Sequence, residues 1–479
     1  MVRVLLGSAF VAAFALVAVA PLSAGSGERT STLADQRQVG LTVYNAGLAL
    51  VHDVRRVRLG DGLNHLAWAD VSGKIDATSV LLENPTVPGS VRVVEQNFNY
   101  DLLSPATLLQ KYVGRDVTVV HPTVGTNRAV RETARVLSTN DGVVLQYADR
   151  VETGVDGRIV FPAIPSNLRE RPTLVLDVTS TTAEPQTLDL SYLTGGLSWR
   201  ADYVGLVSAS DDRMDLSGLV TLSNDTGTSF NDARLQLVAG NVNVAQPPTP
   251  NQMMALGKVS ARTSDEFAQQ NFFEYHLYSL SRPTSIADKQ TKQIALLSAH
   301  RIAVRKTLEL RGAESYYTQA QPDLGDRLPV GVYFGFENRG GELGMPLPAG
   351  IVRLYKHDAN GTSLFLGSDQ IDHTPKNESV RLRLGDSFDV SARKKQTDFR
   401  ERVLIAGRPY DQSSYQIVLR NAKDAAVDVL IVEPVPGEWQ IVDESAKHAK
   451  TSASTATWTV RVPAGGSTTL TYTVRTFLG

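Results

Sequence analysis

Apolar and polar residues alternate with a period of two along most of the sequence, which is the pattern of strands that bury one face. A first strand begins at Leu41, and the alternation continues through residues 48–54 and 56–59. Turn signals separate such runs at Gly60-Asp61-Gly62, Asp141-Gly142, Asp156-Gly157, Asn360-Gly361 and Gly465-Gly466. Residue pairs of this kind supply the positive φ angles of tight hairpins. The pattern predicts an all-β protein.

One helix interrupts the strands. Ser104 is suited to cap its start, Pro105 fits the first helical position, and Gly114 can end it. Leu108, Leu109 and Tyr112 would line one face. Four short strands follow, so the segment is predicted to be a small barrel that carries one short helix and is inserted between larger sheets.

Asparagine ends three similar strands. Asn224, Asn338 and Asn421 each close an alternating run and are followed by a polar or glycine-containing turn and a further strand. An asparagine side chain can bond its own backbone in such turns. The repetition is typical of sandwich hairpins.

These signals predict a multidomain β-sandwich architecture with a small inserted β-barrel and an immunoglobulin-like C-terminal domain. The expected segments are a signal peptide (1–24), N-terminal strands (37–101), the small barrel (102–172), the first part of a central sandwich (173–245), a linker or loop (246–270), the second part of that sandwich (271–409) and the C-terminal domain (410–479). The linker is rich in Pro, Gln and Met, and about six strands are expected in the last segment.

The first residues predict export. Arg3 precedes an uncharged run over residues 4–20, Pro21 breaks it, and Ala24 offers a cleavage point. An uncleaved anchor is the alternative, because the uncharged stretch is barely long enough to span a bilayer. We expect cleavage, no membrane span afterwards, and a location in the periplasm or outside the cell.

Composition excludes several functions. Lys plus Arg number 48 and Asp plus Glu number 50, for a formal net charge of −2, which argues against a nucleic-acid partner. The absence of Cys excludes disulfide bonds, zinc–thiolate sites, iron–sulfur clusters and thiol nucleophiles. No cofactor is expected, and stability has to come from large apolar cores.

Catalytic signatures are weak. His357 and Asp358 with Asp369, Asp372 and His373 could converge on a cation if a hairpin joined them, but a solvated hairpin is favoured and no metal is assigned. Ser391 and Lys394 match a Ser-x-x-Lys pairing, which requires a helix, whereas this stretch reads as a strand. A carboxylate pair for glycoside cleavage cannot be selected from the sequence, so the catalytic residues stay unknown.

One aromatic cluster provides the candidate ligand-binding residues. Tyr192, Trp199 and Tyr203 could form a platform that stacks on a sugar, with Arg200 and Asp202 as its polar rim. The alternative is a buried Trp on a core strand after a Gly-Gly bulge, and this alternative is favoured. Tyr192, Trp199, Arg200 and Tyr203 are nevertheless the candidates for ligand binding.

A basic run ends the stretch 381–395, where Arg393, Lys394 and Lys395 are consecutive. It could bind an anionic polymer. A solvated edge strand, whose charges discourage aggregation between sheets, is the favoured alternative.

Three spaced motifs carry a resemblance. They are Tyr-x-x-x-Gly-Leu-Ser-Trp-x-Ala-x-Tyr at 192–203, the stretch 219–243, and Leu-x-Leu-Gly-x-x-Phe-Asp-Val at 382–390. With these motifs the sequence resembles the bacterial domain of unknown function 4139 family, a domain that also forms the C-terminal part of mucoidy inhibitor A proteins. The resemblance covers roughly residues 41–479 and implies an exported, mainly β protein. It brings no established activity or agreed catalytic residues, so none are carried over.

The combined prediction is an exported protein of the cell envelope. A non-catalytic binding or structural module is favoured over an enzyme. We expect an envelope glycan or another protein as its partner, contacted through exposed aromatic rings and sheet edges. The alternative is a secreted hydrolase that acts on envelope polysaccharide. The sequence assigns no oligomeric state.

Overall fold

The computed structural model describes residues 27–45, 47–99, 102–122, 129–165, 168–240, 271–272, 275–321, 324–405 and 408–477. The predicted signal peptide and the whole of the predicted linker lie outside these residues. Strands dominate the described chain, arranged in several sheets, so the predicted all-β class is confirmed. In the same residues, no helix has the length and apolarity needed to cross a membrane.

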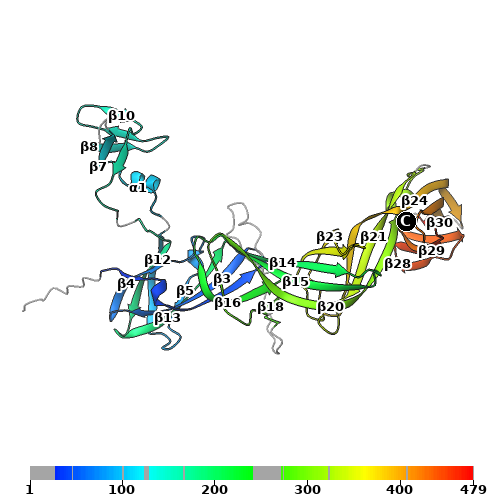
Figure 1. Cartoon of the computed structure of the whole chain (residues 1–479), viewed down its shortest axis with the longest axis horizontal. Coiled ribbons are helices and arrows are strands. Elements are labelled where there is room, and N and C mark those ends of the chain that lie inside the picture. Colours follow the sequence, from blue (N-terminus) through cyan, green and yellow to red (C-terminus); the bar gives the residue numbers. More distant parts are fainter. Residues whose placement is uncertain are drawn as a thin grey trace, which may run out of the picture. The chain divides into compact units, whose positions relative to one another are not determined.

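The chain forms two compact units (Figure 1). In the described residues, the first unit comprises 27–37, 53–73 and 77–191, and the second comprises 38–52, 74–76 and 192–477. The first elements in chain order are β1 (Arg29–Ser31), the 3-10 helix η1 (Leu33–Asp35), β2 (Gln36–Tyr44), β3 (Leu48–Arg58), β4 (Gly62–Ala69), the 3-10 helix η2 (Ala77–Ser79), β5 (Leu81–Glu83), β6 (Val91–Asn99), α1 (Pro105–Lys111), β7 (Asp116–Pro122), β8 (Ala129–Ser138), β9 (Val144–Gln146), β10 (Val151–Thr153), β11 (Arg158–Val160), β12 (Thr173–Ser180) and β13 (Pro185–Gly195).

The second half of the chain adds the longest strands. Its elements are β14 (Leu197–Val207), β15 (Arg213–Asn224), β16 (Phe230–Ala239), β17 (Asn271–Phe272), β18 (Tyr275–Ser279), β19 (Thr284–Ile286), β20 (Gln290–Arg311), the 3-10 helix η3 (Glu314–Tyr317), β21 (Leu328–Glu337), β22 (Gly350–His357), β23 (Ser363–Ile371), β24 (Ser379–Ile405), β25 (Arg408–Asn421), β26 (Val427–Pro434), β27 (Glu438–Glu444), β28 (Ala449–Ser452), β29 (Thr455–Val462) and β30 (Ser467–Phe477).

A four-stranded sheet in the first unit has the order β1-β4-β12-β6. β1 runs parallel to β4, with Arg29 opposite Leu66, whereas β12 is antiparallel to both of its neighbours. Strand alternation places Leu66, Trp68 and Leu174 in the core, where each is fully buried. β1 ends the order of this sheet, so it is an edge strand of the described residues.

The predicted barrel is an open five-stranded sheet of order β10-β9-β8-β7-β11, and this part of the prediction is wrong. Its end strands β10 and β11 are three residues long and do not pair with each other in the described chain. The predicted helix is confirmed as α1, with Ser104 as its N-cap. Leu108, Leu109 and Tyr112 of this helix region pack on the apolar residues of the sheet, so a helix, rather than closure of the sheet, covers that core.

The second unit contains a thirteen-stranded sheet with the main order β23-β22-β14-β15-β20-β21-β24-β25-β30-β27. Strands β26, β28 and β29 join it through β20 and one another, while β16 pairs with β2, β18 and β19. A large apolar core lies among β20, β21, β24 and the strands that follow, and it includes Leu310, Val330, Tyr415, Trp458 and Tyr472.

The asparagine repetition has one structural cause. Asn224, Asn338 and Asn421 are buried, and each side-chain amide donates to main-chain carbonyl groups of two segments. Each Oδ1 also accepts an N–H from the loop that follows. The side chain therefore replaces the strand ladder where the backbone leaves the sheet.

Three of the predicted hairpins are corrected. The strands beside Asp141-Gly142 and Asn360-Gly361 pair as expected. By contrast, β3 and β4 beside Gly60-Asp61-Gly62 belong to different sheets. The strands beside Asp156-Gly157 (β10 and β11) and beside Gly465-Gly466 (β29 and β30) each pair with other strands. A turn signal marks where the chain reverses, but burial of the flanking apolar faces decides which strands pair.

Candidate functional site

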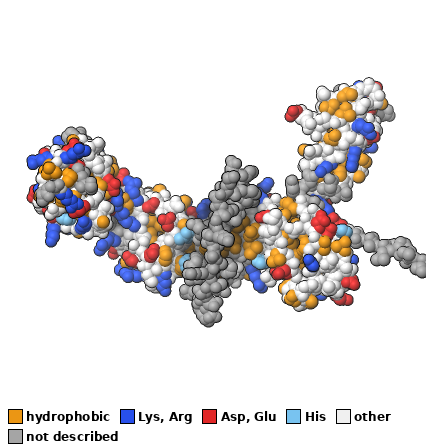
Figure 2. All heavy atoms as spheres, turned by 180° about the vertical axis from the view of Figure 1, so that it is seen from behind, with side chains coloured by type: hydrophobic (Ala, Val, Ile, Leu, Met, Phe, Trp, Pro, Cys, Tyr) orange, Lys and Arg blue, Asp and Glu red, His pale blue; other side chains and the backbone are white. Residues whose placement is uncertain are grey.

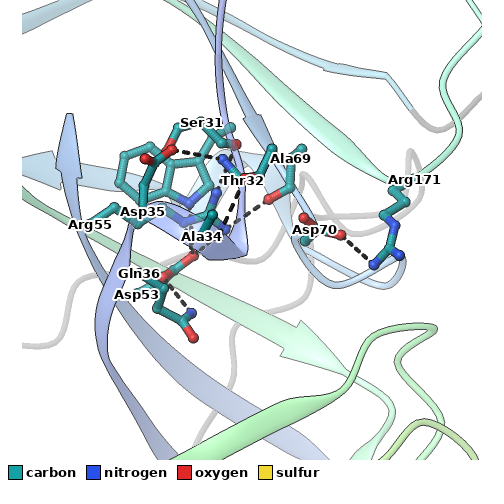
Figure 3. Close-up of polar contacts among 11 residues, drawn as sticks. Ser31, Thr32, Ala34, Asp35, Gln36, Asp53, Arg55, Ala69, Asp70 and Arg171 are labelled. Atoms are coloured by element: carbon teal, nitrogen blue, oxygen red, sulfur yellow. Dashed lines mark hydrogen bonds and ion pairs between the residues drawn. The ribbon is translucent and has the colours of Figure 1, made fainter. Parts of the chain in front are cut away.

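A buried ion pair lies in the core of the first unit. Asp53 and Arg55 are two residues apart on β3, so both point to the same face of the strand. Arg55 is 0% exposed and Asp53 3% exposed. The guanidinium donates to Asp53 Oδ2 from Nη2 at 2.7 Å and from Nε at 3.0 Å (Figure 3). Such a pair persists in a core only if its remaining polar atoms also find partners.

Neighbouring strands supply those partners. Trp68 Nε1 on β4 donates to the same Asp53 Oδ2 at 2.8 Å, and Gln36 Nε2 donates to Oδ1 at 2.8 Å. The Arg55 guanidinium carbon lies 4.7 Å from the centre of the Trp68 ring. The carboxylate thus accepts from three side chains, which offsets the cost of removing it from water.

The remaining N–H groups of Arg55 fix two separate stretches of backbone. Nη1 donates to the carbonyl of Ser31 at 2.9 Å, and Nη2 donates to that of Ala69 at 2.8 Å (Figure 3). Ser31 ends β1 and leads into η1, whereas Ala69 ends β4. One buried cation therefore holds the ends of two neighbouring strands in place.

A cavity of about 580 Å³ opens beside these strand ends. The lining residues are Thr30, Thr32, Leu33, Ala34, Ala69, Asp70, Leu168, Arg169, Glu170, Arg171 and Thr173. The wall formed by η1 is fixed by a capping box, in which Thr32 Oγ1 accepts from Ala34 N and Asp35 Oδ2 accepts from Thr32 N. This wall of the cavity is therefore held by its own hydrogen bonds.

Both arginines that line the cavity are held in ion pairs. Arg171 Nη1 donates to Asp70 Oδ1 at 2.7 Å, and both outer nitrogens of Arg169 donate to Glu28 at 2.6 Å. The hydrogen bond from Arg169 lowers the pKa of Glu28 below its usual value, although partial burial opposes this. Asp70 has a left-handed backbone with φ of 65°, which is uncommon for a residue with a side chain. Groups held as ion pairs are suited to recognition more than to proton transfer.

The three rings of the candidate aromatic platform are buried rather than exposed. Tyr192, Trp199 and Tyr203 are 1%, 5% and 0% exposed, so their rings belong to the interior. Trp199 packs edge-on against Tyr278 at 6.4 Å, and the Tyr203 hydroxyl donates to the carbonyl of Pro348. Stacking on a ligand requires exposed ring faces. A binding role for these rings stays a prediction that their burial does not support.

Arg200 and Asp202 lie on the opposite face of β14 from Trp199 and Tyr203, because side chains alternate along a strand. Arg200 is exposed and donates to Asp202 at 3.1 Å. Asp202 is buried and also accepts from Arg353 and Thr221. The strand thus separates the rings from the charges that were expected to form one site.

The histidine candidates do not converge. His357 and His373 lie at opposite ends of the β22–β23 hairpin, because His357 is opposite Ser363 and Gly350 is opposite Ile371. His373 Nδ1 accepts from Ala349 N at 3.1 Å. Within the described ranges, no group of three or more His, Asp or Glu side chains is arranged to hold a metal ion.

The stretch that ends in the basic run is only partly interior to the sheet. β24 pairs with β21 over residues 379–392, whereas Arg393, Lys394 and Lys395 pair with β25 alone among the described strands. Arg381 and Arg383 are exposed and pair with Glu309 and Asp386, whereas Lys394 is buried. On the face that Figure 2 shows, basic and acidic side chains are interspersed. Ser391 and Lys394 lie on a strand, as the sequence predicted, and are three positions apart, so they point to opposite faces and cannot form a Ser-x-x-Lys pair.

Sequence reasoning missed the Asp53–Arg55 cluster, although a signal existed. The buried face of β3 carries Ala49, Val51, Asp53, Arg55 and Val57 at alternate positions. Two opposite charges within an apolar row indicate a buried ion pair.

The comparisons concern mainly the second unit. A family model described as Domain of unknown function (DUF4139) matches residues 188–477, which is more than half of the chain. All three motifs that carry the resemblance lie inside this range, whereas the cavity lies before it. No curated protein matches the sequence.

Proposed function

We propose that this chain, which belongs to the family of this domain of unknown function, is an exported, non-catalytic binding module of the cell envelope. Export is supported by residues 1–24, where Arg3, an uncharged run and small residues before Ala24 form a signal-peptide pattern. The periplasm or the extracellular space is the proposed location.

The observation that carries the binding role is the cavity of the first unit. Arg55 fixes the two strand ends beside it, and the arginines that line it are held in ion pairs. Its lining combines apolar side chains such as Leu33 and Leu168 with hydroxyl groups and paired charges. Where lining groups are already held by hydrogen bonds, less has to be ordered when a ligand enters, which reduces the entropy cost of binding.

The position of the cavity favours a protein partner. Thr30 of the edge strand β1 lines the cavity and is exposed. An extended segment of a partner can add to such an edge by main-chain hydrogen bonds, while one of its side chains enters a neighbouring pocket. We propose an extended peptide segment of an envelope protein as the ligand.

The proposal is tested with purified protein and isolated envelope fractions, by measuring retained protein and released soluble fragments over time. Ala34→Trp places a large side chain in the cavity from an exposed position, and Ala446→Trp is the control at an exposed position in the other unit. We expect retention of the wild type and the control, loss of retention for Ala34→Trp, and no fragments. Fragments that accumulate with time would overturn the proposal in favour of a hydrolase. Unchanged retention of Ala34→Trp would show that the cavity is not the binding site.

Export is tested separately by N-terminal sequencing of protein recovered outside the cytoplasm. The expected first residue is Gly25. An N-terminus that retains residues 1–24 would contradict cleavage and favour the uncleaved anchor.

A further inference from the structure

Lys394 and Glu433 form a second buried pair, in the core of the second unit. The side chain of Lys394 is 1% exposed and that of Glu433 is 0% exposed, and Nζ lies 2.8 Å from Oε1. Lys394 lies on β24 and Glu433 on β26, and these strands pair with other strands rather than with each other. The contact therefore joins two parts of the fold that share no hydrogen-bonded ladder.

Tyrosine rings surround the ammonium group and exclude water from it. Nζ lies 4.5 Å from the ring centre of Tyr316 and 4.6 Å from that of Tyr415, and those of Tyr317 and Tyr472 lie at 5.6 and 5.7 Å. Gly312 leaves room on the carboxylate side, since a Cβ there would collide with Glu433 Oε2.

The contact is unusual for a salt bridge. Although the two atoms are 2.8 Å apart, neither Lys394 Nζ nor Glu433 Oε1 makes a hydrogen bond of acceptable geometry within the described part of the chain. Buried polar atoms almost always make such bonds, so an exception calls for a physical reason. An ammonium group has three donors and a carboxylate has ample acceptor capacity, and the pair leaves much of both unused here.

We propose that Lys394 and Glu433 condense after folding to an isopeptide bond between Nζ and the side-chain carbonyl carbon Cδ of Glu433. This inference concerns a covalent modification and stands independently of the binding role proposed above.

The reaction is balanced without another reactant. A proton passes from the ammonium to the carboxylate, which leaves a neutral amine and a carboxylic acid. The Nζ lone pair then forms the bond to Cδ, the bond from Cδ to Oε1 breaks, and Oε1 leaves as water with two hydrogens that began on Nζ. Nothing is oxidised or reduced.

The surrounding groups favour each step. Burial lowers the pKa of Lys394 against the opposing charge of Glu433, which brings the neutral amine within reach. The Tyr317 hydroxyl donates to Glu433 Oε2 at 2.7 Å, and the Tyr472 hydroxyl donates to the Tyr317 oxygen at 2.8 Å. Burial raises the pKa of both tyrosines well above the usual value, so they stay protonated donors. Tyr317 can thus stabilise the negative charge that develops on Oε2 when Nζ attacks.

Two further arguments favour the amide as the product. Fixing amine and carboxyl group in contact removes the entropy cost of bringing them together. A neutral amide also replaces an ion pair whose burial is costly.

The test is the intact mass of the purified chain under denaturing conditions, followed by peptide mapping. We expect a mass one water below that of the sequence, and a branched peptide that joins the segments of Lys394 and Glu433. Lys394→Arg should have the full sequence mass. Glu433→Gln can form the same link by losing ammonia, so it should reach the same final mass as the linked wild type.

Lys395→Arg is the matched control, because it changes the neighbouring residue and should still lose one water. A wild-type chain with the full sequence mass would overturn the proposal. So would a loss of water that persists in Lys394→Arg or maps to other residues, such as an aspartate that has cyclised. The wild-type peptide map decides the question even if a variant does not fold.

Discussion

Arg55 and Trp68 donate hydrogen bonds to the same oxygen of Asp53, while the guanidinium of Arg55 lies over the indole ring of Trp68. Oδ2 of this aspartate thus accepts three N–H groups in a buried position. The other hydrogen bonds of Arg55 within the described residues go to main-chain carbonyls, which are neutral acceptors. Loss of the Asp53 side chain would therefore leave several buried N–H donors without their acceptor.

We expect Asp53→Ala to lower the free energy of unfolding of the first unit by about 3–5 kcal/mol, because it leaves a buried guanidinium without its carboxylate. Hydrogen exchange of the β4 and β12 amides measures this loss locally. Asp428→Ala removes one member of an exposed ion pair with Arg461 and should change stability by less than about 1 kcal/mol. Equal effects of the two substitutions would contradict a stabilising role for the cluster.

The sequence predicted the strand class, the helix and the three asparagines, because each depends on local rules. Alternation defines a strand, and Ser104 with Pro105 defines a helix start. It did not predict which strands pair. Gly60-Asp61-Gly62 follows β3, but the partners of β4 are β1 and β12 rather than β3. Pairing depends on long-range burial of apolar faces, which no local signal contains.

The candidate site shows the same division. The sequence suggested a shared site for Tyr192, Trp199 and Arg200 because aromatic and charged residues lie close together along the chain. On a strand, however, adjacent side chains point to opposite faces. Asp53 and Arg55 were missed, although their spacing places them on one buried face. Asp70 and Arg171 meet only in the folded chain, so no spacing could have predicted their contact.

Asn421 tests the repeated asparagine role. Its amide donates to the carbonyls of Ala425 and Pro463, and its oxygen accepts from Lys423 N. Asn421→Ala leaves these buried groups unpaired, so we expect a loss of about 2–4 kcal/mol in the free energy of unfolding. Asn140→Ala, at an exposed turn, should stay within about 0.5 kcal/mol of the wild type. Denaturant unfolding compares them, and a small effect at Asn421 would contradict the role.

Trp199 tests the aromatic cluster. The ring is buried, and its N–H has no hydrogen-bond partner in the described residues, so its contribution is packing. Trp199→Ala should lower the free energy of unfolding by about 3–5 kcal/mol, and Trp199→Phe should cost less because it keeps an aromatic ring. Envelope retention per folded molecule should not change. A Trp199→Ala variant that is as stable as the wild type but no longer retained would show that the ring contacts a ligand.

Asp202 makes stability depend on pH in a direction that can be worked out. Burial alone would raise the pKa of its carboxyl group, but hydrogen bonds from Arg353 and Thr221 and the charges of Arg200 and Arg353 outweigh burial, so the pKa is lowered. A lowered pKa in the folded state means that the ionised form stabilises the fold. This contribution is complete above the unfolded pKa of about 3.9 and is lost as the pH falls through the lower folded value.

We therefore expect the stability difference between the wild type and Asp202→Asn to be largest near neutral pH and to shrink as the pH falls below about 4. Thermal unfolding at a series of pH values measures this difference. Arg353→Met removes a charged hydrogen-bond donor to Asp202, so it should raise the folded-state pKa of Asp202 towards the unfolded value. The difference in stability between Arg353→Met and Asp202→Asn should then be smaller at neutral pH than that between the wild type and Asp202→Asn. It should also vanish at a higher pH. A difference between the wild type and Asp202→Asn that stays constant across this range would mean that the charge of Asp202 does not stabilise the fold. The hydrogen bonds of Asp202, such as that from Thr221, would then be its only contribution to stability.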